Sequence, residues 1–343
     1  FNLALLYRDR GDFKAAEPIQ RQVLALDRQH YDANHPTVAY SLMSLGNTLV
    51  ENGQFEEAER NFREALEIRR ATLEPGHPDI VKNLGTVGLT MCRGGDYGGA
   101  EPVLREAAAM GKEHLGNHRI TAGRLDDLGW LMKDLGRYDE ALGYHEEALA
   151  IKLEVLGPEH KNTGITWMHL ARAHQGLGDL EAALAAQKKA VAIGMANYGA
   201  ENMFTATAMM GEARILLDME RLEEARTVAA VALANMRKAA PKDSPRLAGS
   251  LQMMAAIHRE SGENVEAERL LRQALAIRRD RLGADHPLTA WTEVQLADLL
   301  VERGAQDEAA VLAGAGHAAL ERKLPEGHYK IERAEVTLAK ANR

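Results

Sequence analysis

The chain has very few of the residues that build disulfide frameworks or cysteine-ligated zinc sites. Cys92 is its only cysteine, so a disulfide framework cannot form and a zinc site made from several cysteines is excluded. We interpret Cys92 as a small packing residue, and we expect a reducing, cytoplasmic setting. Aromatic residues make up only 5% of the chain, whereas Ala, Leu and Glu are abundant, which favours helix over sheet.

Long apolar runs and an excess of positive charge are also missing. No segment has the roughly 18 consecutive apolar residues of a membrane span, so we expect no membrane association. Lys and Arg number 42 against 50 Asp and Glu, and the net charge of −8 argues against general nucleic-acid binding. The phosphate-loop, H-E-x-x-H and G-x-S-x-G motifs are absent, so we expect neither an enzyme nor a cofactor site.

What the sequence does contain is a repeat of about 42 residues, first visible as His-Pro at His35, His77 and His286. One series of small residues consists of Ala4, Gly46, Gly88, Gly129, Ala171, Ala213, Ala255 and Ala297. A second series consists of Ala16, Ala58, Ala100, Ala141, Ala183, Ala225, Ala267 and Ala309. Between the two lie Gly11, Gly53, Gly95, Gly136, Gly178, Gly262 and Gly304, with Glu220 as the exception.

Each series has a physical explanation. Small residues let two helices approach closely, and the glycine between them ends the first helix in a left-handed conformation. Asp12, Asp96 and Asp179 follow that glycine and are good N-caps for a second helix. Each unit is therefore predicted to be helix, turn, helix. We interpret the corner histidines as helix-start hydrogen-bonding groups that lie one repeat apart and share no metal ion: His35, His77, His118, His160, His286 and His328.

The apolar pattern resembles that of the tetratricopeptide repeat. The resemblance is carried by Leu42-x-x-Leu45-Gly46, by Ala58-x-x-x-Phe62 with Ala65, and by Trp167-x-x-Leu170-Ala171. The longer period and the corner Leu282-Gly283-Ala284-Asp285-His286-Pro287 are similar to the kinesin light chain type of this repeat. The resemblance implies an all-α, right-handed superhelical solenoid of helix-turn-helix repeats.

We predict one solenoid domain over residues 1–343, closed by a capping helix at about 329–343. The predicted repeats are 1–34 (truncated), 35–76, 77–117, 118–159, 160–201, 202–243, 244–285 and 286–327. Because Phe1, Leu3, Leu5 and Leu6 are apolar where a terminal repeat has a polar outer face, we expect further sequence before Phe1.

The resemblance also implies that the first helix of each repeat lines a concave groove. At the groove-facing positions, arginines recur in consecutive repeats and methionines stand one turn away. Arginine binds carboxylates bidentately, and methionine adapts to irregular apolar groups, which suits an acidic peptide with an apolar anchor. The candidate groove residues are Trp130, Met168, Arg172, Met210, Arg214, Arg259 and Asn47. The alternative is that these are ordinary solvated residues of the helices.

We therefore predict a non-enzymatic scaffold for protein–protein interaction that binds a peptide or protein segment in its groove, with no nucleic-acid or membrane partner. The alternative is a sensor or regulatory arm of a larger signalling protein. Repeats of this length resemble those attached to bacterial serine/threonine kinases, ATPase-type regulators and caspase-like proteases.

Overall fold

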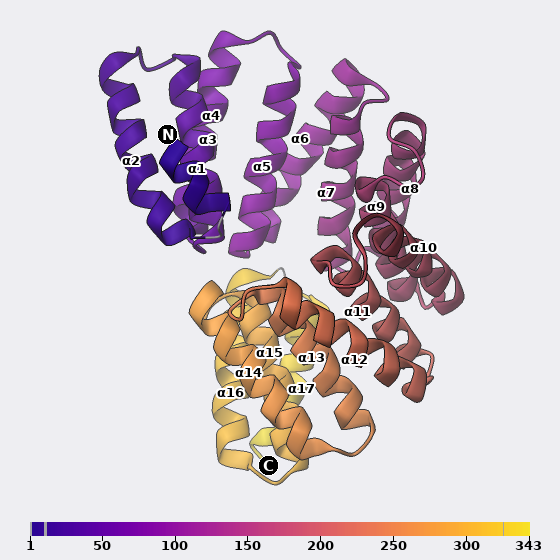
Figure 1. The fold of residues 1–343 in the computed structure, drawn as a ribbon. Helices are drawn as coiled ribbons and strands as arrows, with labels where there is room; N and C mark the ends of the chain where they lie inside the picture. Colours follow the sequence, from indigo (N-terminus) through magenta and orange to yellow (C-terminus); the bar gives the residue numbers. More distant parts are fainter. Residues whose placement is uncertain (1, 10–11, 325) are drawn as a thin grey trace. The chain divides into compact units, whose positions relative to one another are not determined.

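The computed structural model describes residues 2–9, 12–324 and 326–343, and all of its regular secondary structure in these ranges is helical (Figure 1). The chain forms two compact units, residues 1–128 and 129–343, called unit 1 and unit 2 below. The prediction of an all-α fold built from helix-turn-helix repeats is confirmed. The single solenoid domain over the whole chain stays a prediction.

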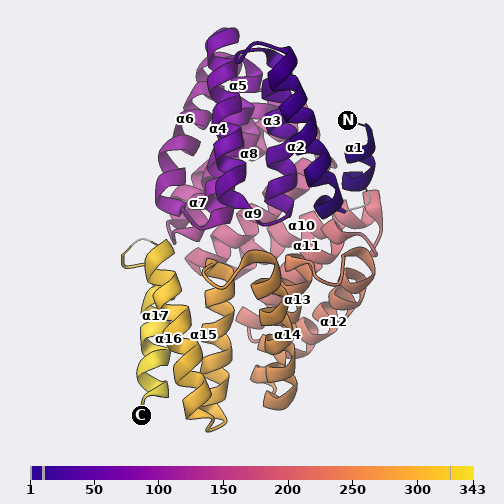
Figure 2. The ribbon, with the colours of Figure 1, turned by 90° about the vertical axis from the view of Figure 1, so that its left-hand side faces the viewer.

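Helices of consecutive hairpins stand next to one another in each unit (Figure 2). Unit 1 contains α1 (Asn2–Asp9), α2 (Phe13–His30), α3 (Pro36–Glu51), α4 (Phe55–Thr72), α5 (Pro78–Gly94), α6 (Tyr97–Leu115) and most of α7 (Arg119–Asp134). Unit 2 contains the end of α7, α8 (Tyr138–Val155), α9 (Lys161–Leu177), α10 (Leu180–Tyr198), α11 (Met203–Asp218), α12 (Leu222–Ala239), α13 (Pro245–Glu260), α14 (Asn264–Leu282), α15 (Pro287–Glu302), α16 (Gln306–Lys323) and α17 (Tyr329–Ala341).

The corner histidines begin helices, as predicted. In each of the six, Nδ1 accepts a hydrogen bond from the backbone N–H two residues later, at 3.1 to 3.2 Å. Where the repeat has Asn202 or Ser244 instead of histidine, the side-chain oxygen makes the same bond, to Phe204 and Arg246. The histidine at this corner is therefore a capping group that satisfies an N–H left open at the helix start.

The first helices end at the predicted glycines. Gly53, Gly95, Gly136 and Gly178 have φ between 77° and 92°, in the left-handed region that suits glycine. The next repeat has Glu220 at this position, and its φ of 61° makes it the only non-glycine residue with positive φ in the described part of the chain. The repeat thus imposes a left-handed residue even where the sequence does not supply glycine.

The small residues lie where helices pack against each other. Every described alanine of the second series is fully buried, at 0% exposure. A Cβ added to Gly46 would lie 2.5 Å from the Phe62 ring, so the aromatic ring of α4 occupies the space that this glycine leaves. At Gly129 the same space holds the ring of His145, which is 1% exposed. Cys92 is buried on α5, in agreement with its interpretation as a packing residue.

Two residues near the start of the chain that the sequence analysis used, Phe1 and Gly11, lie outside the described residues. Leu3 and Leu6, the apolar residues of α1 named there, are exposed by 53% and 56%.

No described helix has both the length and the apolarity that crossing a membrane requires.

Candidate functional site

Unit 2 contains a cavity of about 590 Å³. Most of its wall comes from first helices of repeats, namely the end of α7, α9, α11 and the start of α13. Tyr138, Gln187 and Met236 on the second helices complete it. The size lies within the range of about 300–1,000 Å³ that ligand pockets occupy.

The charged side chains that line this cavity are all basic. They are Lys133, Arg172, Arg214 and Arg246, and no described Asp or Glu lines the cavity. Lys133 is ion-paired with Asp134, its neighbour in the chain. None of the three arginines forms an ion pair with a carboxylate of the described residues. The cavity therefore carries positive charge in a protein whose net charge is −8.

The arginines lie near enough to influence one another. Burial lowers the pKa of the half-buried Arg172 guanidinium; attraction to Asp134 opposes this, and repulsion from Arg214 and Arg246 adds to the lowering. Burial likewise lowers the pKa of Arg214, whose Nε donates to the sulfur of Met253 at 3.0 Å. Because arginine stays protonated at neutral pH, these clustered charges persist, and an anion would relieve their repulsion.

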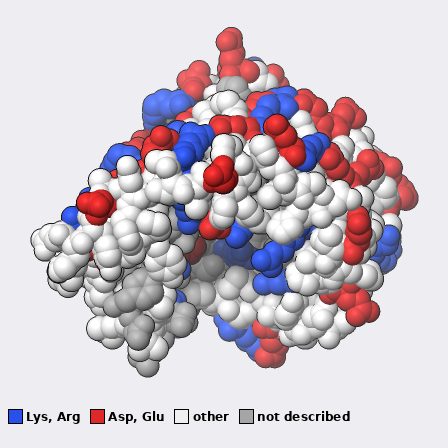
Figure 3. Space-filling view, turned by 90° about the horizontal axis from the view of Figure 1, so that it is seen from above, with Lys and Arg blue, Asp and Glu red and all other residues white. Residues whose placement is uncertain are grey.

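Arginines on the second helices of the repeats form ion pairs that the cavity arginines lack. There, arginines bind carboxylates of the neighbouring hairpin, as in Arg21–Glu57 at 2.6 Å and Arg272–Glu308 at 2.7 Å. On the face drawn in Figure 3, acidic and basic side chains lie interspersed over the surface. The arginines of the cavity differ from these two in forming no ion pair with a described carboxylate.

Beside the cations, the cavity has an apolar wall and several uncharged hydrogen-bonding groups. Met210, Ile215, Met236 and Met253 contribute the apolar part. The polar groups are Gln175, Gln187, Thr207 and Ser250, with Tyr138 at the edge of α8. A ligand that combines negative charge with an apolar side chain would match both kinds of surface.

The structure brings together three of the seven predicted groove residues: Arg172, Met210 and Arg214 all line the cavity. Trp130 lies on α7 and is half-buried, with the Lys133 ammonium 5.6 Å from its ring centroid, but it does not line the cavity. Asn47 is exposed on α3 and belongs to unit 1.

The remaining two predicted residues have other environments. Met168 is only 7% exposed and packs with Ile193 and Phe204 in a small apolar core. Arg259 does not line the cavity, and its Nε donates to Glu302 of α15 at 3.2 Å. One helical position within a repeat therefore does not face the same space in every repeat of this unit.

Sequence reasoning left out two cations of the cavity. Lys133 lies one turn after the groove position of its repeat, so the same helical spacing could have found it. Arg246 lies in the first turn of α13, where the equivalent residue two repeats earlier is Asn162, so no repeat pattern marks it. Only the packing of α13 beside α11 places Arg246 at the cavity.

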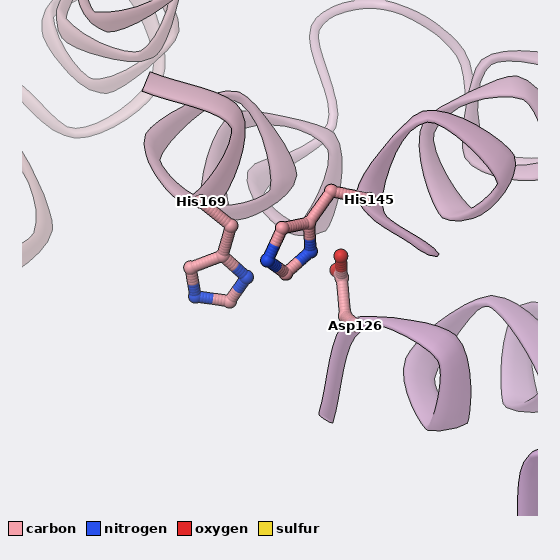
Figure 4. Close-up of side chains that lie close together, drawn as sticks. All are labelled: Asp126, His145 and His169. Carbon is pink, nitrogen blue, oxygen red and sulfur yellow. The ribbon is translucent and has the colours of Figure 1, made fainter. Parts of the chain in front are cut away.

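A second polar group in unit 2 is a pair of histidines on neighbouring helices. His145 of α8 and His169 of α9 have ring centroids 4.9 Å apart, and Figure 4 shows the two rings next to each other. His145 stands where Phe62 stands in its own repeat, against a glycine of the first helix. We therefore interpret His145 as the packing residue of its hairpin.

Comparison with known proteins identifies the repeat. The sequence profile of the tetratricopeptide repeat matches residues 1–71, 38–113, 79–154, 127–196, 162–238 and 246–321. These overlapping matches extend over most of the chain. A comparison with curated protein sequences finds no match.

Solved structures with a similar fold include kinesin light chain-like and Rap proteins. A point variant of a putative kinesin light chain of Podosopora anserina, with nearly identical repeats, is 24% identical, with a TM-score of 0.50 over 57% of this chain and 92% of its own. RapI without ligand is 16% identical, with a TM-score of 0.65 over 82% of this chain and 96% of its own. A Rap protein complexed with competence and sporulation factor is 12% identical, with a TM-score of 0.62 over 99% of this chain and 96% of its own.

Proposed function

The chain belongs to the tetratricopeptide repeat family, and from this membership we propose that it is a non-enzymatic scaffold that binds an acidic segment of a peptide or protein. The binding site is the cavity of unit 2, with Arg172 and Arg214 as the main contacts. The observation that carries the proposal is the convergence of three arginines beside an apolar wall. Asp134 and Asp218 attract Arg172 and Arg214, but none of the three forms an ion pair with a described carboxylate.

The chemistry of the cavity matches such a segment. A carboxylate can accept two parallel hydrogen bonds from one guanidinium, and such charge-assisted bonds contribute about 1.5–3 kcal/mol each. A leucine or similar side chain next to the carboxylate would pack on Met210 and Met253, which are flexible and polarizable. The Rap protein complexed with competence and sporulation factor has a similar fold, which is compatible with ligand binding by this chain.

The test uses labelled short peptides that carry leucine together with glutamate, glutamine or lysine, and it measures fluorescence polarization. We expect the glutamate peptides to bind and the glutamine and lysine peptides to bind far less. Raising the salt concentration should weaken binding, because exposed charges are screened over about 8 Å at physiological ionic strength.

The decisive variant is the double change Arg172→Glu with Arg214→Glu. Loss of two charged contacts of about 1.5 kcal/mol each would weaken binding at least about 100-fold. The control is Lys188→Glu with Lys242→Glu, which alters the net charge equally at exposed positions outside the cavity. The proposal is wrong if the glutamate peptides bind the Arg172/Arg214 variant as tightly as the unchanged protein, or if they bind none of the proteins.

A further inference from the structure

Gly249 of α13 lines the unit 2 cavity and has open space beside it. Nothing lies within 4 Å of a Cβ built at this position, although the residue is half-buried. It lies inside the helix, five residues after the N-cap Ser244. Glycine inside a helix is destabilising relative to alanine, so its presence at this position needs a reason.

The two other glycines that line the cavity have a packing role that Gly249 lacks. A Cβ at Gly176 would overlap the ring of Tyr138, and a Cβ at Gly211 would lie 2.7 Å from the amide nitrogen of Gln187. Both glycines therefore make room for another side chain of this protein. No described side chain uses the room beside Gly249, so this glycine keeps part of the cavity open.

The repeat itself does not require glycine at this position. The equivalent residues, five after the helix cap, are Thr207 on α11 and Trp291 on α15. Neighbouring hairpins thus accommodate both a β-branched and a large aromatic side chain at the same point of the first helix. The absence of a side chain at Gly249 is therefore a property of this repeat and not of the fold.

Gly249 lies between a charged and an apolar residue of the cavity wall. Arg246 is three residues before it and Met253 is four residues after it, so the three share one face of α13. The backbones of Arg246 and Met253 are about 10 Å apart along the helix axis, at 1.5 Å per residue. An extended peptide covers that distance with about three residues. A ligand that contacts both residues along this face passes over Gly249.

Two hydroxyl groups of the cavity wall are hydrogen-bond acceptors for a ligand. The Ser250 hydroxyl donates to the carbonyl oxygen of Arg246 at 3.2 Å, and the Thr207 hydroxyl donates to the carbonyl oxygen of Met203 at 2.7 Å. Because each hydroxyl has a single hydrogen, its oxygen can only accept a further bond, whereas the arginines only donate. The matching ligand therefore combines a carboxylate with N–H donors, as an acidic peptide does and a simple carboxylic acid does not.

We propose that the main chain of the acidic segment crosses α13 at Gly249, so that this residue makes the cavity specific for a peptide over a small organic anion. The inference rests on the proposed function of the same cavity. A side chain at position 249 would take the space of the ligand's main chain. The same change favours the helix, because alanine has a higher helix propensity than glycine. Binding and stability should therefore change in opposite directions, which a glycine needed for packing would not produce.

The variants are Gly249→Ala and Gly249→Leu, and the matched controls are Gly143→Ala and Gly143→Leu. Gly143 lies inside α8, is exposed, has nothing within 4 Å of a Cβ and does not line the cavity. Thermal unfolding should show a Tm that is raised by about 2–4 °C in both alanine variants. A lower Tm in Gly249→Ala would overturn the inference, because the space beside Gly249 would then be needed for packing.

Fluorescence polarization with the labelled glutamate peptides measures binding. We expect the affinity to fall about 10-fold in Gly249→Ala and at least about 100-fold in Gly249→Leu, because added atoms in a filled site force the ligand or the helix to shift. The Gly143 variants should bind like the unchanged protein.

A second set of peptides, each with one backbone N–H replaced by N-methyl, tests the main chain directly. At least one of them should bind the unchanged protein about 5-fold more weakly than its parent, the equivalent of one hydrogen bond. Equal affinity of Gly249→Leu and the unchanged protein, or methylated peptides that all bind like their parent, would overturn the inference and leave the proposed function standing. Absence of glutamate-peptide binding to the unchanged protein would refute both.

Discussion

Glu220 offers a direct test of how the repeat ends its first helices. It occupies the position where the other described repeats have glycine, and its φ of 61° is left-handed. The hydrogen bonds around it match those around a glycine: Glu220 N–H donates to Leu217 and Arg221 N–H to Leu216, both at 2.9 Å, while Gly178 N–H donates to Gln175 at 3.1 Å. The required geometry is the same, but glutamate has a Cβ that opposes it.

The expected effect of Glu220→Gly follows from two opposing terms. A left-handed conformation costs a residue with a Cβ roughly 1–2 kcal/mol, which glycine avoids. Glycine makes the unfolded chain more flexible, which costs about 0.4–1 kcal/mol. No ion pair of Glu220 with a described residue is lost, because its exposed carboxylate has none. The net expectation is a stabilisation of about 0.5–1 kcal/mol.

Thermal unfolding followed by circular dichroism measures this effect. For a unit of about 150–250 residues, 1 kcal/mol shifts Tm by roughly 2–4 °C, so we expect a rise of about 1–4 °C. The reverse change, Gly178→Glu, should lower Tm by a similar amount, because nothing lies within 4 Å of a Cβ at Gly178 and only backbone strain is added. A Tm that falls in Glu220→Gly, or stays constant in both variants, would refute the reasoning.

Three further predictions concern packing, capping and pH. Ala183→Leu should lower the free energy of unfolding, measured by urea titration, by roughly 1–3 kcal/mol, because Ala183 is fully buried. The control Ala185→Leu, at an exposed position of the same helix, should change it by less than about 0.5 kcal/mol. His160→Ala should cost about 0.5–2 kcal/mol through loss of the α9 cap; an equal loss in His160→Asn would contradict the capping explanation. Burial, the largest cause, and the nearby Lys330 lower the pKa of His328 below 6.5, against the opposing effects of Asp134 and Glu332. Folding thus favours the neutral ring, so the contribution of His328 to the free energy of unfolding is complete above about pH 6.5 and is lost as pH falls below that value. Hydrogen exchange of residues 328–334 should therefore be faster at pH 5 than at pH 7 after correction for intrinsic rates, and an equal or slower rate at pH 5 would contradict this.

The sequence by itself determined the repeat and its local geometry. Capping, left-handed turns and close helix contacts depend on residues a few positions apart, so they recur wherever the residue type recurs. The sequence alone could therefore assign His77 and Asp96 as helix caps and Ala100 as a helix contact. Even Glu220 was visible as the exception to the glycine series.

Only the tertiary structure decided which side chains share the cavity. Met168 and Met210 have the same repeat position, yet the first packs against Phe204 and the second lines the cavity, because the surroundings of each hairpin differ. Arg246 reaches the cavity only through the packing of α13 beside α11. No spacing in the sequence encodes the contact between His328 and the carbonyl of Asp134, which are 194 residues apart. Periodicity fixes the face on which a residue lies, whereas the neighbours of that face depend on how the hairpins stack.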